Sequence, residues 1–381
     1  NEGFQGPCAF TTDDFIRSLQ IPRDLTIGVM INASEVVGGM PQAEALQCLF
    51  PNAAKDSPVK LVRIACHVHE FEKALIAVNW LKERGYQVGF NLMQVADRGA
   101  SEVKALALQA KAYPIDTLYF ADSMGSMSPE NTAQIIGWFR AEWNGPMGIH
   151  THDNLGLALS NTLRAIDEGV SWVDSTVTGM GRGPGNARTE ELAIEIAQRR
   201  GCGVNMVPLM ELIREHFKPM QVKYGWGTNP YYYLAGKYGI HPTYIQEMLC
   251  DPRYNEEDVL SVIENLRVGG GKKFSFNTLD AARHFYRGKP IGTWSPREMF
   301  SGREVLLLGT GPGVAKHRAA IERYICKKQP LVLALNTQTG IAADLIDLRV
   351  ACHPVRLLAD CHLHTLLPQT LITPFSMLSE D

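Results

Sequence analysis

Short apolar runs alternate with segments of helical periodicity from Leu25 to about Arg200. Apolar runs bounded by polar residues predict buried strands, and apolar residues spaced three and four apart predict helices. The predicted strands are Leu25–Ile31, Val59–Cys66, Gln87–Met93, Thr117–Ala121, a strand from Met147 through His152, and Val170–Asp174. The predicted helices are Pro41–Phe50, Phe71–Arg84, Ser101–Ala112, Pro129–Trp143 and a helical pattern from Leu155 to Ile166. This alternation indicates an α/β fold with parallel strands.

Polar residues stand at the carboxyl end of each predicted strand. They are Asn32, His67, Asn91, Asp122, His150 with His152, and Asp174. In a TIM (β/α)8-type barrel the loops after the strands form one rim, and that rim carries the chemistry. An open doubly wound sheet normally places its glycine loop after the first strand, whereas here the loop Gly179–Asn186 follows the last one. The pattern therefore favours a TIM-type barrel, of which six strands are visible.

The composition leaves this fold unchanged but excludes several kinds of partner. The chain has 381 residues, of which 45% are hydrophobic and 20% charged, and a net charge of -3, as is typical of a globular protein with more than one domain. No basic block suits a nucleic-acid backbone, and no apolar run approaches the roughly 20 residues of a membrane span. The eight cysteines form no C-x-x-C pair, so we expect reduced thiols and a cytoplasmic location.

Two histidines give the first indication of chemistry. His150 and His152 are two residues apart on a predicted strand, so both imidazoles point to the same face. A packed or solvated histidine pair would have the same spacing. A metal site is favoured because Asp153 and Asn154 follow the pair and a glycine-rich loop comes one strand later. Two imidazoles alone would accept Zn²⁺ or Co²⁺ as well as harder ions.

Four segments carry a resemblance to a known family. They are HTHDNLGLALSNTLRAIDEG, GMGRGPGNARTEEL, VRIACH and ADSMGSM, and they resemble the DRE-TIM metallolyase superfamily, above all its 4-hydroxy-2-oxovalerate aldolase-like branch. The resemblance covers about Phe10 to Tyr244. It implies that His150 and His152 ligate a divalent metal, Mn²⁺ or Mg²⁺, with Asn186 at or beside it. It also implies that the substrate cavity and catalytic site are lined by His67, Asn91, and Asp122 with Ser123.

The resemblance implies a divalent-metal-dependent (class II) aldolase or lyase. Such an enzyme cleaves or forms a carbon-carbon bond in a 4-hydroxy-2-oxo acid, with pyruvate enolate as intermediate and a 2-oxo acid and an aldehyde as its small-molecule partners. No lysine stands at a predicted strand end to form a Schiff base, which favours the metal route. Two alternatives stay open: an acyl-CoA condensing or cleaving enzyme of the same superfamily, and a catalytically silent barrel with a nucleotide-binding C-terminal unit. A homo-oligomer is also compatible with the sequence.

The sequence departs from the family at its first strand. Family members open with D-x-T-L-R-D-G, which supplies a third metal ligand and an arginine, and no such motif occurs here. We therefore expect an N-terminally incomplete barrel, with strands 3 to 8 of the family barrel. The strands Leu25–Ile31 and Ser171–Thr176 should lie at the gap, and we expect negligible aldolase activity from residues 1 to 381 alone.

The remaining patterns predict four parts: a TIM-barrel aldolase domain (1–204), a helical extension (205–287), a linker (288–302) and a partial Rossmann-like α/β domain (303–381). In the extension, Val207–Phe217 predicts a helix, and the aromatic cluster of residues 224–233 either packs on the barrel or supplies a proton-donating tyrosine. In the last part, G-x-G-x-G at residues 309–313 follows a strand and precedes a helix, a weak indication of nucleotide binding. We find no strand pattern after Leu331–Leu335.

Overall fold

The structure is a computed structural model. It describes residues 12–251, 254, 256–269, 271–275, 278–279, 291–292, 294–353, 356–357 and 360–377. The chain divides into two compact units, Asn1–Glu247 and Met248–Asp381, and each is considered by itself. The predicted boundaries at residues 204, 287 and 302 stay predictions, and the predicted linker lies partly outside the described residues.

The first unit is built on a parallel sheet of six strands. They follow one another across the sheet in chain order, and each pair of neighbours is parallel. The strands are β1 (Ile27–Asn32), β2 (Val59–Cys66), β3 (Gln87–Leu92), β4 (Thr117–Asp122), β5 (Met147–Thr151) and β6 (Trp172–Val173). A doubly wound sheet reverses its strand order at a switch point. The uninterrupted order here is that of a β/α barrel and confirms the predicted barrel-type fold.

The ring of strands is open in the described part of the chain. Within it, β1 pairs only with β2 and β6 only with β5, so these two strands form the ends of the sheet, as predicted for the strands at Leu25–Ile31 and Ser171–Thr176. The last strand is shorter than predicted, since only Trp172 and Val173 keep strand pairing. An end strand is paired on one side alone, which explains its early departure from the sheet.

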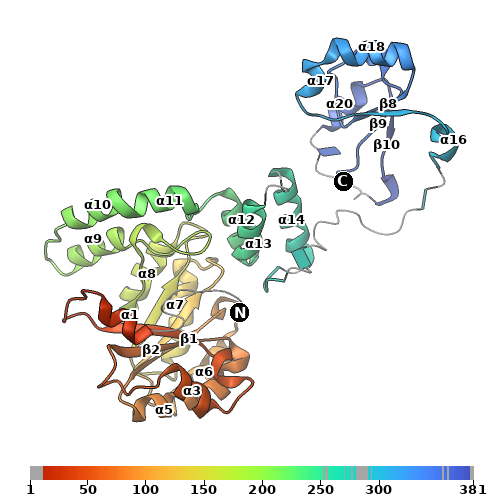
Figure 1. Ribbon diagram of the computed structural model, residues 1–381. Helices are drawn as coiled ribbons and strands as arrows, with labels where there is room; N and C mark the ends of the chain where they lie inside the picture. Colours follow the sequence, from red (N-terminus) through yellow and green to blue (C-terminus); the bar gives the residue numbers. More distant parts are fainter. Residues whose placement is uncertain are drawn as a thin grey trace. The chain divides into compact units, whose positions relative to one another are not determined.

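Helices and short helical turns lie around the strands of the first unit (Figure 1). They are α1 (Thr12–Ser18), α2 (Ser34–Val37), α3 (Gln42–Leu49), η2 (Val68–Glu70), α4 (Phe71–Ala74), α5 (Ile76–Glu83), η3 (Val95–Asp97), α6 (Ala100–Lys111), α7 (Pro129–Arg140), α8 (Ala158–Asp167), η4 (Val177–Gly179) and α9 (Thr189–Arg199). Helix α7 begins where the sequence predicts: the Ser128 hydroxyl accepts a hydrogen bond from the Asn131 backbone N–H, and Pro129 takes the first turn. Ser, and Pro at the first turn, are typical helix-start residues.

Alternate residues of the strands face opposite sides of the sheet. On β2, Val62 and Ile64 belong to the main hydrophobic core with the helices, and on β3 Val88 and Phe90 do the same. The intervening positions therefore face the concave side. Many side chains on the concave side are buried as well, for example Ala65, which is 5% exposed. Strands buried on both faces are what the continuous apolar runs of the sequence indicate.

The first unit continues in a helical run whose aromatic residues pack on the barrel loops. Its elements are α10 (Val207–Leu212), the π-helix η5 (Ile213–Phe217), α11 (Lys218–Tyr224), α12 (Pro230–Tyr238) and the first part of α13 (Pro242–Cys250), which crosses the boundary between the two units. The Trp226 indole N–H donates to the carbonyl oxygen of Thr178 at 3.1 Å. Tyr232 is 3% exposed, and a Cβ at Gly183 would lie 3.0 Å from its ring. The sequence left two interpretations of the aromatic cluster, packing on the barrel or supply of a proton-donating tyrosine. The contacts of Trp226 and Tyr232 agree with packing.

The second unit contains a smaller parallel sheet with the order β10-β9-β8-β7. Its elements are α14 (Glu256–Gly269), α16 (Arg297–Phe300), β7 (Val305–Leu308), α17 (Gly313–Lys316), α18 (Arg318–Lys328), β8 (Leu331–Leu335), η6 (Ala343–Leu345), β9 (Leu348–Val350), α20 (Cys361–Leu366), β10 (Thr370–Ile372) and η7 (Phe375–Met377). The expectation of no strand after Leu335 is wrong, because β9 and β10 follow. Each has three residues, too few to leave a periodic pattern. None of the described helices is long and apolar enough to cross a membrane.

Candidate metal centre

The structure brings His150 and His152 together at the carboxyl end of β5. The two ring centres are 4.9 Å apart and the ring planes stand at 86° to each other. A metal ion lies about 2 Å from each imidazole nitrogen that ligates it, so rings at this separation can reach the same ion. The prediction that both imidazoles lie on the same face of the strand is thus confirmed.

Both rings are held through the same nitrogen. The Nδ1 of His150 lies 2.9 Å from Oδ2 of Asp174, and the Nδ1 of His152 donates to the backbone carbonyl of Asp122 at 2.8 Å. Metal-binding histidines usually donate their second ring N–H in this way, to a carboxylate or a carbonyl. Burial, with the nearby His150, lowers the pKa of His152 to about 3, so its ring is neutral, the form that ligates a metal. Each Nε2 is left for an ion.

Asn186 reaches the pair from the glycine-rich loop. An isolated antiparallel bridge joins it to His152, and its side-chain amide donates to the carbonyl oxygen of Met180 at 3.2 Å. The amide donates through its nitrogen, so Oδ1 is the Asn186 atom that could ligate an ion. The loop needs its glycines: Gly185 has φ +84°, and a Cβ there would lie 2.3 Å from the carbonyl oxygen of Gly179.

The donor set fits a divalent ion in an open site. Two imidazoles and an amide oxygen would fill three positions and leave others for water or substrate, as catalytic metal sites require. In the part of the chain that the structure describes, no group of three or more His, Cys, Asp or Glu side chains is arranged to hold an ion. The two histidines and Asn186 are therefore the candidate ligands that the described residues offer.

Asp122 and Ser123 organise the rim loops. The Asp122 carboxylate is fully buried and accepts hydrogen bonds from the backbone N–H groups of Ser126 and Met127, at 3.0 and 3.2 Å. Burial raises the pKa of Asp122 to about 6, against these hydrogen bonds. The Ser123 hydroxyl accepts from the backbone N–H of Gln94 at 3.0 Å. Their side chains hold the loops after β3 and β4, and it is the Asp122 carbonyl that contacts His152.

His67 directly follows β2, and Asn91 lies on the neighbouring strand β3. The His67 backbone N–H donates to the Glu70 carboxylate of η2 at 3.1 Å, and the His67 ring stacks on that of His69 with centres 5.6 Å apart. Burial, with the charges of Arg182 and His67, lowers the pKa of His241 to about 4, so His67 lies within electrostatic range of the helical run. Asn91 is 5% exposed, and its Oδ1 has no hydrogen-bond partner among the described residues. It is a buried acceptor on the concave face.

Two residues on the concave face were not predicted as part of the site. Arg63 on β2 places its Nη1 2.8 Å from both carboxylate oxygens of Asp174. Its guanidinium carbon lies 3.8 Å from the ring centre of Tyr119 on β4. Burial raises the pKa of Asp174, but the His150 hydrogen bond and the Arg63 charge outweigh it and lower that pKa overall. Asp174 is thus a carboxylate shared by Arg63 and His150.

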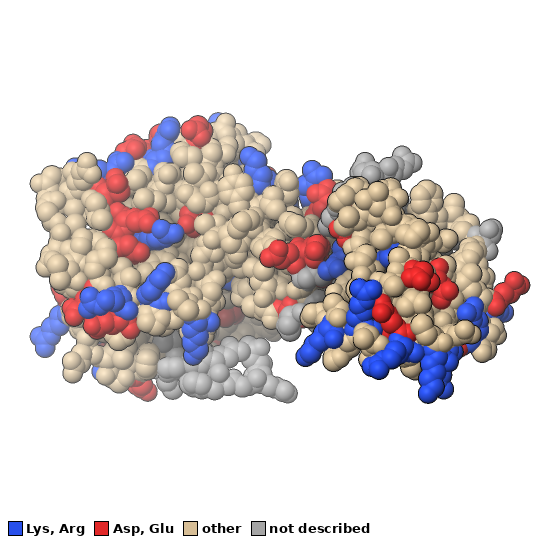
Figure 2. Space-filling view, turned by 90° about the horizontal axis from the view of Figure 1, so that it is seen from above, with Lys and Arg blue, Asp and Glu red and all other residues tan. Residues whose placement is uncertain are grey.

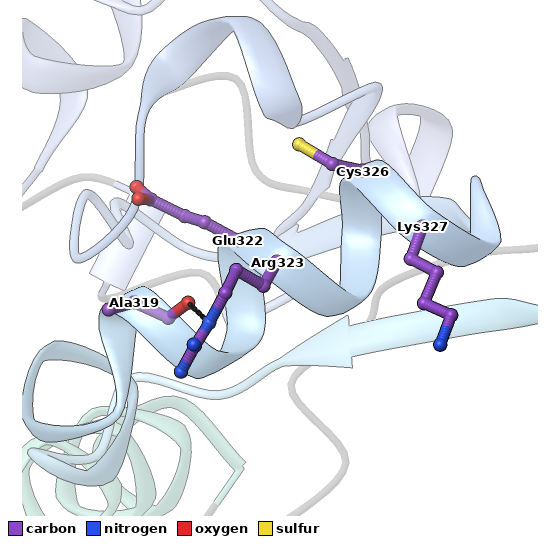
Figure 3. A pocket seen from close by; sticks show the side chains of 5 residues that line it. All are labelled: Ala319, Glu322, Arg323, Cys326 and Lys327. Atoms are coloured by element: carbon purple, nitrogen blue, oxygen red, sulfur yellow. Dashed lines mark hydrogen bonds between the residues drawn. The ribbon is translucent and has the colours of Figure 1, made fainter.

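The second unit offers no comparable cluster among its described residues. Lys and Arg side chains gather on one part of the surface seen in Figure 2. In the second unit, helix α18 has the basic residues Lys327 and Lys328 in its last turn. A hollow lies along α18, lined by Ala319, Glu322, Arg323, Cys326 and Lys327 (Figure 3). All five come from one helix, and the Arg323 Nε–H donates to the Ala319 carbonyl of that helix. The hollow is an open helix surface rather than a converging site.

Comparison with known proteins gives a consistent picture. Residues 56–214 match the family described as HMGL-like. A 4-hydroxy-2-oxovalerate aldolase of Pelotomaculum thermopropionicum is 35% identical over 166 residues, 43% of this chain and 49% of that protein. One from Carboxydothermus hydrogenoformans is 32% identical over 225 residues, 58% of this chain and 62% of that protein. The chain thus spans about half to three fifths of the length of these curated relatives.

Solved structures are similar to this chain as well. The N-terminal domain of a Bacteroides vulgatus protein described as an aldolase is 28% identical with a TM-score of 0.59, covering 65% of this chain and 81% of that chain. The carboxyl transferase domain of Rhizobium etli pyruvate carboxylase has a TM-score of 0.52 at 14% identity, covering 68% of this chain and 47% of that chain. The latter likeness concerns the fold alone.

Proposed function

We propose that the protein is a divalent-metal-dependent carbon-carbon lyase of the aldolase type, and the match of residues 56–214 to the HMGL-like family supports this. Its substrate would be a 4-hydroxy-2-oxo acid, cleaved to or formed from pyruvate and an aldehyde. The curated relatives at 30% to 35% identity carry the name 4-hydroxy-2-oxovalerate aldolase. They support the reaction class, and the side chain of the aldehyde is left open.

One observation carries the proposal. Both histidines at the end of β5 direct their Nδ1 atoms at fixed acceptors, Asp174 for His150 and the Asp122 carbonyl for His152. A packed pair would also hydrogen-bond its ring N–H groups, but here both rings use the same nitrogen, and this fixes tautomer and ring orientation so that both Nε2 atoms can serve one ion. We therefore assign His150, His152 and Asn186 as the residues that would hold the ion.

When bound, a divalent ion supplies a Lewis acid that polarises the carbonyl of a 2-oxo acid and stabilises the enolate of carbon-carbon cleavage. The chain's own residues then have separate tasks. Asn91, with its buried unpaired acceptor, and His67 are assigned to substrate contact. Asp122 and Ser123 are positioning residues, since their side chains hold the rim loops. Mn²⁺ or Mg²⁺ is proposed as the ion, with Zn²⁺ and Co²⁺ as the alternatives that two imidazoles allow.

The proposal is tested by solvent exchange of the pyruvate methyl protons. Enolisation is common to any aldehyde partner, so deuterium uptake measured by mass spectrometry needs no knowledge of the second substrate. The assay is run on the chain as given, with pyruvate and the metal ion as the added components.

We expect deuterium uptake that requires Mn²⁺ or Mg²⁺, stops with EDTA and is lost in His152→Ala. His317→Ala is the matched control, because His317 is an exposed histidine of the second unit. Uptake that survives EDTA or the His152 substitution would contradict the metal-dependent route. Exchange of acetyl-CoA protons in place of pyruvate protons would replace the aldolase by the acyl-CoA enzyme of the same superfamily.

We also propose a cytoplasmic location and small-molecule partners. The seven cysteines in the described residues are free thiols, which suits a reducing compartment. Assembly into a homo-oligomer remains part of this proposal, and sedimentation of the purified protein would decide it.

A further inference from the structure

The concave face of the first unit contains an ion pair between distant strands. Arg63 lies on β2 and Asp174 directly follows β6, four strands away in the sheet. At the usual spacing of about 4.8 Å between strands, four steps of a flat sheet span about 19 Å. An arginine and an aspartate cannot bridge that distance, so the 2.8 Å contact exists because the sheet curves. The pair crosses the interior of the open barrel.

The neighbouring strands are shaped around Arg63. Its guanidinium carbon lies over the Tyr119 ring, 3.8 Å from the ring centre. A Cβ at Gly89 on β3 would approach the Arg63 Cγ to 3.0 Å, and a Cβ at Gly148 on β5 would lie 2.3 Å from Tyr119. Glycine on both flanking strands therefore makes the space in which the arginine and the tyrosine lie.

Stability alone gives a poor account of this arrangement. The Arg63 side chain is 14% exposed, and its Nε and Nη2 have no hydrogen-bond partner among the described residues. Burying a charge with unpaired donors is costly, and a buried ion pair is often no more stabilising than apolar residues of similar size. The contact that Arg63 does make goes to the carboxylate that holds His150.

The two histidines differ in what holds them. His152 is fixed by a backbone carbonyl, which the fold of the strand positions without help from another side chain. His150 is fixed by the Asp174 carboxylate, which could rotate away at the end of a strand of two residues. Arg63 contacts both oxygens of that carboxylate and so leaves it one orientation.

We propose that Arg63 is a positioning residue of the metal centre: by fixing Asp174 it fixes the ring of His150 and directs Nε2 of His150 at the ion. This inference rests on the proposed metal-binding function. It assigns to the centre a residue 111 positions away from Asp174 in sequence. Arg63 acts through Asp174 and touches neither ion nor substrate.

The test compares Mn²⁺ affinity in four variants by titration calorimetry, with the melting temperature of each metal-free protein measured alongside. The variants are Arg63→Met, Arg63→Lys, Asp174→Asn and the double variant Arg63→Met with Asp174→Asn. Lys82→Met is the matched control, since it removes the Lys82–Asp116 ion pair, at 2.9 Å, in the same unit but away from the histidines. Measuring affinity and melting separately distinguishes positioning from a structural role.

We expect Arg63→Met and Asp174→Asn each to weaken Mn²⁺ binding about 10- to 100-fold, the usual effect of losing an outer partner of a metal ligand. The double variant should bind no more weakly than the weaker single variant, because both substitutions break the same chain of contacts. Arg63→Lys should restore part of the affinity relative to Arg63→Met, since a lysine keeps the charge and one nitrogen can contact both oxygens, as Lys82 does with Asp116. It lacks the guanidinium that lies over Tyr119, so the recovery should be incomplete. Lys82→Met should bind like the unaltered protein.

Unaltered affinity in Arg63→Met and Asp174→Asn would overturn the inference, as would a loss that follows the melting temperature and also appears in Lys82→Met. If Arg63→Met does not fold, Arg63→Lys and Asp174→Asn decide by the same criterion. His150→Ala separates this failure from failure of the proposed function. If His150→Ala loses Mn²⁺ binding and the Arg63 variants keep it, only the positioning role of Arg63 is wrong. If the unaltered protein binds no Mn²⁺, the positioning role and the proposed metal-binding function are both wrong.

Discussion

Gly148→Ala tests whether the concave face is packed as the structure describes. The added methyl group would lie 2.3 Å from two carbons of the Tyr119 ring, whereas unstrained carbon contacts are about 3.5 to 4.0 Å. The ring cannot move freely because the Arg63 guanidinium lies 3.8 Å over it. Overpacking of this kind costs about 1 to 3 kcal/mol. For a unit of this size, this corresponds to a fall of roughly 2 to 12 °C in melting temperature.

The assay is thermal unfolding of the metal-free protein followed by circular dichroism. Gly137→Ala is the control, because Gly137 lies inside α7 and its added Cβ meets nothing within 4 Å; alanine there should raise stability by up to about 1 kcal/mol. Adding Tyr119→Leu to Gly148→Ala should recover part of the loss by removing the clashing ring carbons. If the Gly148→Ala protein has the same melting temperature as the unaltered protein, the packing of Tyr119 on β5 is refuted.

Two further predictions concern other parts of the first unit. Burial raises the pKa of the Cys66 thiol to about 12. At pH 8, iodoacetamide should therefore label the exposed Cys48 but not Cys66 until the protein unfolds. Labelling of Cys66 in the folded protein would contradict its burial. The neutral thiol stabilises the folded state below the unfolded thiol pKa, so this contribution should be lost as pH rises toward 12. Trp226→Phe removes the hydrogen bond to Thr178 and should lower the free energy of unfolding by about 1 to 3 kcal/mol in urea titrations; an unchanged midpoint would show that the helical run does not depend on this contact.

The strands of the first unit could be predicted because their pattern is local. Val59–Cys66 has the predicted bounds in the structure, and Gln87–Leu92 and Thr117–Asp122 differ from prediction by one residue. Each is a continuous apolar run buried on both faces. Strand bounds were less predictable where pairing is one-sided, as at β6, and where strands have three residues, as at β9 and β10.

The site was only partly predictable. That the rings of His150 and His152 lie together was predictable because two-residue spacing on a strand is itself the geometric signal; their role as ligands stays a proposal. Arg63 and Tyr119 were missed because their partners are brought together by the curvature of the sheet, which no local pattern encodes. A signal does exist in hindsight: Arg63 interrupts an apolar strand at a position that faces the concave side, and the adjacent position of β3 is Gly89. A buried arginine beside a glycine indicates a long side chain lying across the neighbouring strand.

The central claim is that His150 and His152 hold one divalent ion jointly, and Mn²⁺ titration of the two single variants tests it most directly. Either substitution removes one of the two imidazole ligands, so His150→Ala and His152→Ala should each lose tight Mn²⁺ binding while keeping the circular dichroism spectrum of the unaltered protein. His317→Ala should bind Mn²⁺ normally. Unchanged Mn²⁺ affinity in both His150→Ala and His152→Ala would contradict the metal centre and the function proposed from it.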